Sequence, residues 1–112
     1  MINGAHVIVY STDPEADRAF FSRVFGFGSV DAGHGWLIFA LPKAEAAFHP
    51  DNQNGRHELY LMCDDLKGEM AVLREKGVDC TEVVEARWGF ITKLRLPGGG
   101  EVGLYEPRHS RP

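Results

Sequence analysis

Several features of common protein classes are missing from this sequence. No apolar run approaches the roughly 20 residues that a membrane-spanning helix requires. The N-terminus, MINGAHVIVY, lacks the charged segment ahead of an apolar core that marks a signal peptide. Basic residues are outnumbered, 12 against 16 acidic ones, and they concentrate only in the tail RHSRP. We therefore expect a cytoplasmic protein with no membrane contact and no nucleic-acid partner.

Cysteine is scarce, and the motifs of several enzyme classes are absent. Cys63 and Cys80 form no CxxC pair, so we expect two small, buried or half-buried thiols. The stretch PGGG lacks the lysine and the helix of a phosphate-binding loop, and no G-x-G-x-x-G follows a strand. No serine lies in a nucleophile-elbow context. Phosphate-loop, dinucleotide and serine-hydrolase chemistry are thus unsupported.

What is present is an ordinary globular composition and an internal repeat. The 112 residues, 44% hydrophobic and 25% charged, are sufficient for a single domain over 1–112 with its own core. When the sequence is shifted by 52 positions, His6 falls on Glu58, Asp13 on Asp65 and Trp36 on Trp88. Self-similarity at a fixed spacing indicates a duplicated structural unit.

Each half begins with an alternating apolar stretch and continues into a short helix. The stretches are HVIVY and ELYLM, and an aspartate suited to N-capping follows each of them. The first helix is predicted at about 14–25 and the second at about 66–76, with Gly26 and Gly77 as terminators. Three strand-like segments follow each helix, separated by glycine and proline clusters; the third of the first half is AEAAFHP, residues 44–50.

This order predicts an α+β fold built from two tandem βαβββ modules, at about 5–50 and 57–107. A ferredoxin-like β-α-β-β-α-β fold is the alternative, and it needs two strands between its helices. About 38 residues separate Gly26 from Asp65. Two short strands would leave a long structureless loop in that gap, which counts against the alternative.

The same ordered pattern resembles the vicinal oxygen chelate superfamily, the group of glyoxalase I, bleomycin resistance proteins and extradiol dioxygenases. The resemblance rests on HVIVYSTDPEA at the start, FGF after the first helix and LPGGGEVGLYEP at the end, and it covers about Ala5 to Pro107. It implies a cup-shaped mixed sheet that encloses a small molecule. It also implies that a homodimer completes the cup, with modules paired within one chain or swapped between chains.

In metal-binding relatives the first strand of each module supplies a ligand. The resemblance carries this role to His6 and to Glu58, each of which lies seven residues before a capping aspartate. Strand alternation agrees for the second module, since it places Leu59 and Leu61 on one face and Glu58 on the other. His57 falls on the apolar side and is given no role.

The final strands depart from the family's pattern. Gly103 occupies the position where metal-binding relatives have a glutamate. A third ligand would have to come from Glu101, Glu106, Glu45 or His49, each of which depends on the strand register. Fe, Mn, Ni or Zn sites need at least three protein ligands with open positions.

Two functions therefore remain open. The first is binding of a small organic molecule in an apolar cup whose metal site is incomplete. The alternative is a divalent-metal-dependent lyase or extradiol-type dioxygenase that uses His6 and Glu58 as ligands; a metal-free enzyme with His6 as general base is a third possibility. The residues predicted to line the ligand are Tyr10, Tyr60, Met62, Trp88 and Arg95.

Overall fold

The structure is a computed structural model that describes residue 3 and residues 6–112. It contains two helices and six strands in mixed order. The helices are α1 (Pro14–Arg23) and α2 (Leu66–Glu75), and the strands are β1 (Ser29–Asp31), β2 (Leu37–Phe39), β3 (Tyr60–Met62), β4 (Val84–Ala86), β5 (Gly89–Arg95) and β6 (Glu101–Pro107).

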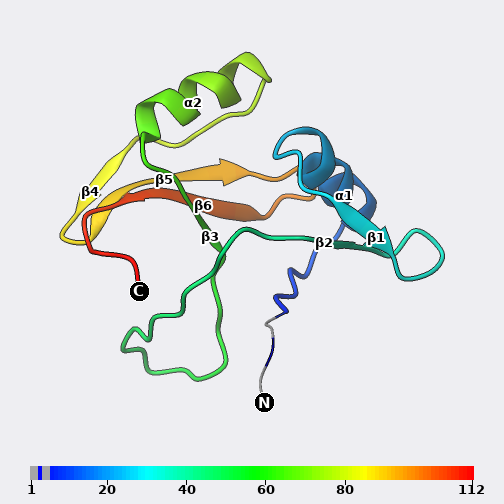
Figure 1. Cartoon of the computed structure of the whole chain (residues 1–112), viewed down its shortest axis with the longest axis horizontal. Helices are drawn as coiled ribbons and strands as arrows, with labels where there is room; N and C mark the ends of the chain where they lie inside the picture. Colours follow the sequence, from blue (N-terminus) through cyan, green and yellow to red (C-terminus); the bar gives the residue numbers. More distant parts are fainter. Residues whose placement is uncertain (1–2, 4–5) are drawn as a thin grey trace.

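The main sheet is formed by the second half of the chain. Its strand order is β3-β6-β5-β4, with β3 parallel to β6 and the other neighbours antiparallel. Both helices lie on one side of this sheet, and the long segment between β2 and β3 lies on the other (Figure 1). β3 is an edge strand, so one side of it has no neighbour in the described chain.

Both helices begin and end where local signals predict. The Asp13 carboxylate accepts a hydrogen bond from the Ala16 amide, and the Asp65 carboxylate accepts one from the Gly68 amide. Gly77, after α2, takes a left-handed conformation with φ 78°, which suits glycine because it has no Cβ. The predicted helix boundaries are therefore confirmed to within two residues.

The hydrophobic core lies between the helices and the main sheet. Leu94 is fully buried in it and Leu104 nearly so, and both contact the cluster formed by Leu66 and Leu73 of α2. A second cluster joins Phe21 of α1 to the β5–β6 end of the sheet. Helical periodicity over 14–25 places Ala16, Ala19, Phe20 and Val24 on one face, and Phe21 lies outside that set.

Hydrogen bonds join α1 to the turn between β5 and β6. The Asp17 carboxylate is buried and accepts from the Gly98 amide at 2.8 Å, while the Thr12 hydroxyl donates to the Gly98 carbonyl at 2.9 Å. A Cβ at Gly98 would lie 2.6 Å from the Ser11 hydroxyl oxygen. The glycine at this turn therefore allows the start of α1 to approach the sheet.

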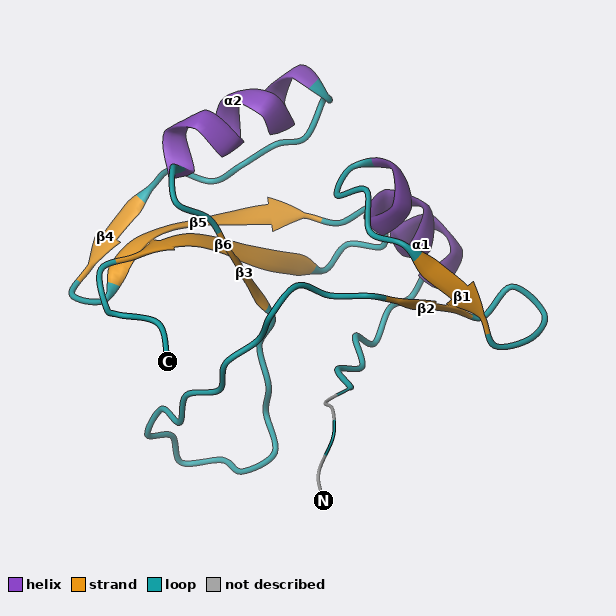
Figure 2. Cartoon of the chain, in the orientation of Figure 1, coloured by secondary structure: helices purple, strands orange, loops and turns teal. Residues whose placement is uncertain are grey.

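The two halves differ in how much of the predicted module forms. The second half has all five elements, β3-α2-β4-β5-β6, whereas the first has α1 and the separate β1–β2 hairpin. The described residues 6–10 and 44–50, both predicted as strands, have no strand structure and appear as loop in Figure 2. Ala5, where the first module was expected to begin, lies outside the described residues.

The reason is that a strand needs a neighbour to bond its backbone groups. Among the described residues no strand pairs with 6–10, and Val7, Ile8 and Val9 are exposed there. The α+β class with two helices and a mixed sheet is confirmed. No helix among the described residues is long and apolar enough to cross a membrane.

Candidate functional site

The main sheet has one face under the helices and one face turned away from them. Leu59, Leu61 and Cys63 contact the core, as strand alternation predicts. Register places Tyr60, Gly103 and Lys93 in one row across β3, β6 and β5 on the opposite face. Met62, Tyr105 and Ile91 form the next row. We call this side of the sheet the open face.

Gly103 lies directly beneath the Tyr60 ring. A Cβ at this position would fall among the atoms of that ring, so no other residue fits without a shift. Gly103 thus leaves the space in which the Tyr60 side chain crosses β6. Because Gly103 has no side chain, Tyr60 on β3 can reach Lys93 on β5.

Glu58, Tyr60 and Lys93 form a polar network. The Tyr60 hydroxyl donates to Glu58 Oε2 at 2.8 Å, and Lys93 Nζ donates to the Tyr60 hydroxyl at 3.0 Å. Lys93 Nζ is also 3.6 Å from Glu58 Oε2 and 4.5 Å from the centre of the Tyr60 ring. The positive charge of Lys93 is therefore matched by Glu58.

The pKa values reflect this pairing. The Tyr60 hydrogen bond, opposed by partial burial and assisted by Lys93 and Arg56, lowers the pKa of Glu58. Burial alone would lower the pKa of Lys93, but the Tyr60 hydroxyl and Glu58 outweigh it and raise that pKa. Both groups are consequently charged at neutral pH.

Three aromatic rings meet beside this network. Tyr60, Trp88 and Tyr105 contact one another edge to face, with ring centres 5.0 to 6.0 Å apart. Tyr105 is buried, whereas Trp88 is 41% exposed. The Trp88 indole is therefore partly exposed to solvent and is held in place by two tyrosine rings.

A basic recess continues from Trp88 to the C-terminal end of the chain. It has a volume of about 470 Å³ and is lined by Arg87, Trp88, Arg108 and His109. Arg108 pairs with Glu85 and lies over the Phe90 ring. None of the ion pairs among the described residues involves Arg87.

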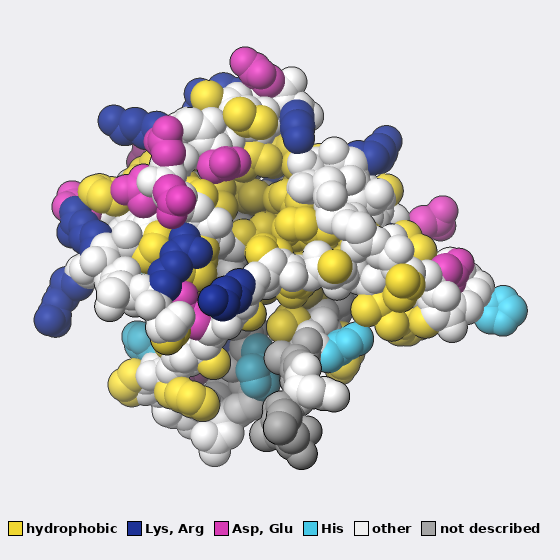
Figure 3. All heavy atoms as spheres, in the orientation of Figure 1, with side chains coloured by type: hydrophobic (Ala, Val, Ile, Leu, Met, Phe, Trp, Pro, Cys, Tyr) yellow, Lys and Arg dark blue, Asp and Glu magenta, His cyan; other side chains and the backbone are white. Residues whose placement is uncertain are grey.

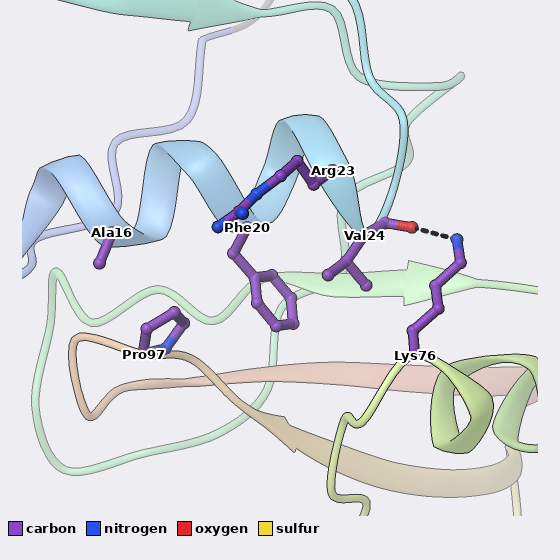
Figure 4. Close-up of a pocket in the computed structure, with 6 residues that line it drawn as sticks. All are labelled: Ala16, Phe20, Arg23, Val24, Lys76 and Pro97. Carbon is purple, nitrogen blue, oxygen red and sulfur yellow. Dashed lines mark hydrogen bonds between the residues drawn. The ribbon is translucent and has the colours of Figure 1, made fainter.

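A second hollow lies between the helices on the other side of the sheet. Figure 3 shows hydrophobic side chains in it, and Figure 4 shows the Phe20 ring between α1 and the strand ends. Its two cations are Arg23, in the last turn of α1, and Lys76, which donates to the Val24 carbonyl at 2.8 Å. Cations at helix C-termini complement the helix dipole, so their position here is explained by the helices.

The predicted metal ligands do not come together. His6 lies exposed outside any strand, and Glu58 is held by Tyr60, Lys93 and Arg56. No group of three or more His, Cys, Asp or Glu among residues 3 and 6–112 could hold a metal ion. Burial also raises the pKa of Cys63 to about 11, which keeps that thiol protonated.

The candidates for a third ligand have other positions. Glu106 lies on the helix side and accepts from the Leu66 amide at 3.0 Å, so it caps the start of α2. Glu101 lies opposite Arg95 on the open face. His49, in the segment 44–50, bonds through Nδ1 to the Pro50 carbonyl at 2.8 Å. Glu45 lies close enough to Tyr105 to add to the burial that raises its pKa.

Most of the residues predicted to line a ligand lie on or beside the open face. Tyr60 and Met62 lie on the open face, and Trp88 borders it. Tyr10 is 90% exposed in the unpaired N-terminal segment. Arg95 lies at the end of β5, two positions beyond Lys93.

Sequence reasoning missed Lys93, Tyr105 and the role of Gly103. The signal that could have revealed them is register. Gly103 is aligned with Tyr60 on β3 and with Lys93 on β5. This alignment allows Tyr60 to contact Lys93 across β6. That alignment depends on long-range pairing, which alternation within one strand does not give.

Solved structures of three proteins share this fold. TnmS3, an antibiotic binding protein from Streptomyces sp. CB03234, has 25% identity and a TM-score of 0.66 over 96% of this chain and 99% of its own. A glyoxalase/bleomycin resistance protein from the same source has 27% identity and a TM-score of 0.60, over 87% and 94%. A lactoylglutathione lyase from Agrobacterium tumefaciens has 16% identity and a TM-score of 0.68, over 92% of both chains.

No protein-family profile matches the sequence, and no curated protein matches it by sequence. The fold is that of the glyoxalase/bleomycin resistance/dioxygenase proteins. This fold spans nearly the whole chain and supports the resemblance to the vicinal oxygen chelate superfamily.

Proposed function

We propose that the protein binds a small aromatic molecule on the open face of the main sheet, without a metal ion. The observation that carries the proposal is the Tyr60–Trp88–Tyr105 cluster beside the Glu58–Tyr60–Lys93 network. Aromatic walls with a few fixed polar groups are the usual composition of a small-molecule site. TnmS3, at 25% identity, is an antibiotic binding protein, which supports binding rather than chemistry.

The replacement of metal ligands supports the same proposal. A metal ion at Glu58 would lie beside the ammonium of Lys93. The Tyr60 ring fills the space over Gly103, the position to which the resemblance assigns a final-strand ligand. Charge repulsion and lack of donors both act against a cation there. The Glu58–Lys93 pair supplies fixed hydrogen-bonding groups instead.

We further propose that a homodimer completes the site. The free edge of β3 and the unpaired stretch 6–10 are complementary, since each has backbone groups without a strand neighbour. Pairing 6–10 of a second copy with β3 would cover Val7 and Val9 and bring Tyr10 toward Tyr60. We propose a single domain over 1–112 whose two modules share a sheet only across this dimer.

The alternative function, a metal-dependent lyase or dioxygenase, would also require this dimer. His6 of a second copy would have to reach Glu58, and Lys93 would have to leave it. Metal analysis of the purified dimer after addition of Fe(II), Mn(II), Ni(II) and Zn(II) distinguishes the two functions. Stoichiometric metal that is lost in both His6→Ala and Glu58→Ala would contradict metal-free binding.

The binding itself is tested with ¹⁵N-labelled protein of the Trp36→Phe variant. Trp36 is an exposed residue of the β1–β2 turn, so its removal leaves Trp88 as the single indole N–H resonance. We expect members of a panel of bicyclic and tricyclic aromatic compounds to shift this resonance in the presence of a chelator. Trp88→Leu in the unlabelled chain should lower the affinity measured by calorimetry about tenfold or more.

The matched control is a change on the helix side of the sheet. Val72 is an exposed apolar residue of α2, and Val72→Ala should leave binding unchanged. If no aromatic compound shifts the Trp88 resonance in the dimer, the open face is not a ligand site.

A further inference from the structure

The basic recess next to Trp88 indicates the class of ligand. We infer that the protein selects an aromatic monoanion, with its ring against Trp88 and its acidic group at Arg87. This inference rests on the proposed function, because it names the ligand class of the same site.

The cations of the open face and of the basic recess differ in their ion pairs. On the open face, Lys93 pairs with Glu58, and Arg56 lies between Glu58 and Asp51. In the recess, Arg108 pairs with Glu85, whereas none of the ion pairs among the described residues involves Arg87. Arg87 and the exposed Trp88 line the same recess.

The Arg108 side chain makes three contacts within the protein. Its guanidinium pairs with Glu85, donates to the Ala86 carbonyl at 3.3 Å and lies 4.5 Å from the centre of the Phe90 ring. It is therefore held in position but electrically balanced. Arg87, the neighbour of Trp88 in the β4–β5 turn, has none of these contacts and is exposed.

His109 connects the recess to the aromatic cluster. Its Nδ1 lies 3.0 Å from the Ser110 carbonyl oxygen, and its Nε2 lies 3.2 Å from the Tyr105 hydroxyl oxygen.

A guanidinium beside an indole favours a flat ligand with a carboxylate. Arginine binds carboxylates through two parallel N–H groups, and an aromatic ring can stack on the exposed face of Trp88. One arginine without an ion pair among the described residues matches one acidic group. The balanced Tyr60–Glu58–Lys93 end would instead meet neutral oxygen substituents, since its hydroxyl and ammonium are already paired.

The test compares two probes of the same shape in the Trp36→Phe dimer. Naphthalene-2-carboxylate carries the charge, and naphthalene-2-carboxamide is its neutral counterpart. The Trp88 indole resonance reports binding of both. We expect the carboxylate to bind about tenfold more tightly at low salt, and the preference to shrink as salt is raised.

Substitution assigns the preference to Arg87. Arg87→Gln should remove most of the carboxylate preference and leave the carboxamide affinity within about twofold. Arg74→Gln, which removes the same charge from the last turn of α2 on the helix side, should leave both affinities unchanged. A preference that survives Arg87→Gln, or equal affinity for the two probes in the parent protein, would overturn the inference.

The outcomes also separate this inference from the proposed function. If the carboxamide shifts the Trp88 resonance as strongly as the carboxylate, the open face binds aromatic ligands but does not select anions. If neither probe shifts it, the aromatic ligand site and its charge selection are both wrong.

Discussion

The two halves of this chain have similar sequences but different structures. The second half forms a complete β-α-β-β-β unit, whereas the first forms a helix and a hairpin. Of the nine buried hydrophobic residues described, eight belong to the second half, and Phe21 is the exception. The difference shows that strand-like sequence is insufficient where the chain offers no neighbouring strand.

The exposed apolar residues of the first half support the same conclusion. Val7, Ile8 and Val9 have the composition of a buried strand and yet contact solvent, while the corresponding positions near β3 pair with β6. Contiguous exposed apolar residues mark an interaction surface. We attribute the incomplete first half to a missing partner strand, and the following changes test the comparison.

The largest effect is expected in the complete half. Leu94 is fully buried between β6 and α2, so Leu94→Ala should lower the free energy of unfolding by about 2–5 kcal/mol. Urea denaturation measures this cost. Val84→Ala, at an exposed position of β4, is the control and should cost about 0.5 kcal/mol or less. Equal costs would mean that the core does not lie where it is described.

The next effect concerns the connection between the halves. Asp17→Ala would leave the Gly98 amide without its acceptor, at a cost of about 1–3 kcal/mol in urea denaturation. Asp17→Asn keeps an oxygen at the same place and should recover a large part of that loss. If asparagine proves as damaging as alanine, the hydrogen bond is not what holds α1 to the β5–β6 turn.

Gly103 tests the open face. Gly103→Ala places a Cβ in the Tyr60 ring and should cost about 1–3 kcal/mol through overpacking. Tyr60→Ala combined with Gly103→Ala removes the clash, so the two costs should be non-additive in a double-mutant cycle. Additive costs would show that the ring does not lie over this glycine.

The smallest effect is electrostatic. The pKa of Glu58 is lowered in the folded protein, so its contribution is present above the ordinary value of 4.5 and is lost as pH falls through the lower folded value. The carboxylate is nearly half exposed, and the contribution should be below about 1 kcal/mol. Glu58→Gln should therefore flatten the acid limb of stability against pH, whereas Glu75→Gln on α2 should not.

Local signals in the sequence were sufficient for the helices and for the faces of β3. Asp13, Asp65 and Gly77 determine where helices begin or end through contacts within a few residues. Alternation separated Leu61 from Tyr60 because it depends only on the strand itself.

Long-range contacts could not be predicted in this way. The Asp17 carboxylate accepts a hydrogen bond from the Gly98 amide, which is 81 positions away in the sequence. Glu106 caps α2 through the Leu66 amide, 40 positions away. The role of Gly103 depends on the register of β6 with both β3 and β5, and the sequence alone does not give that register. The predicted strands at 6–10 and 44–50 pair with no strand among the described residues.

Hydrogen exchange at residues 7–10 tests the account most directly. If a second copy pairs this stretch with β3, its backbone amides will be protected at concentrations where sedimentation shows a dimer, and exposed on dilution. Val9→Lys should abolish both the dimer and the protection, while Val72→Lys on α2 should affect neither. Amides at 7–10 that exchange freely in a stable dimer would contradict the account.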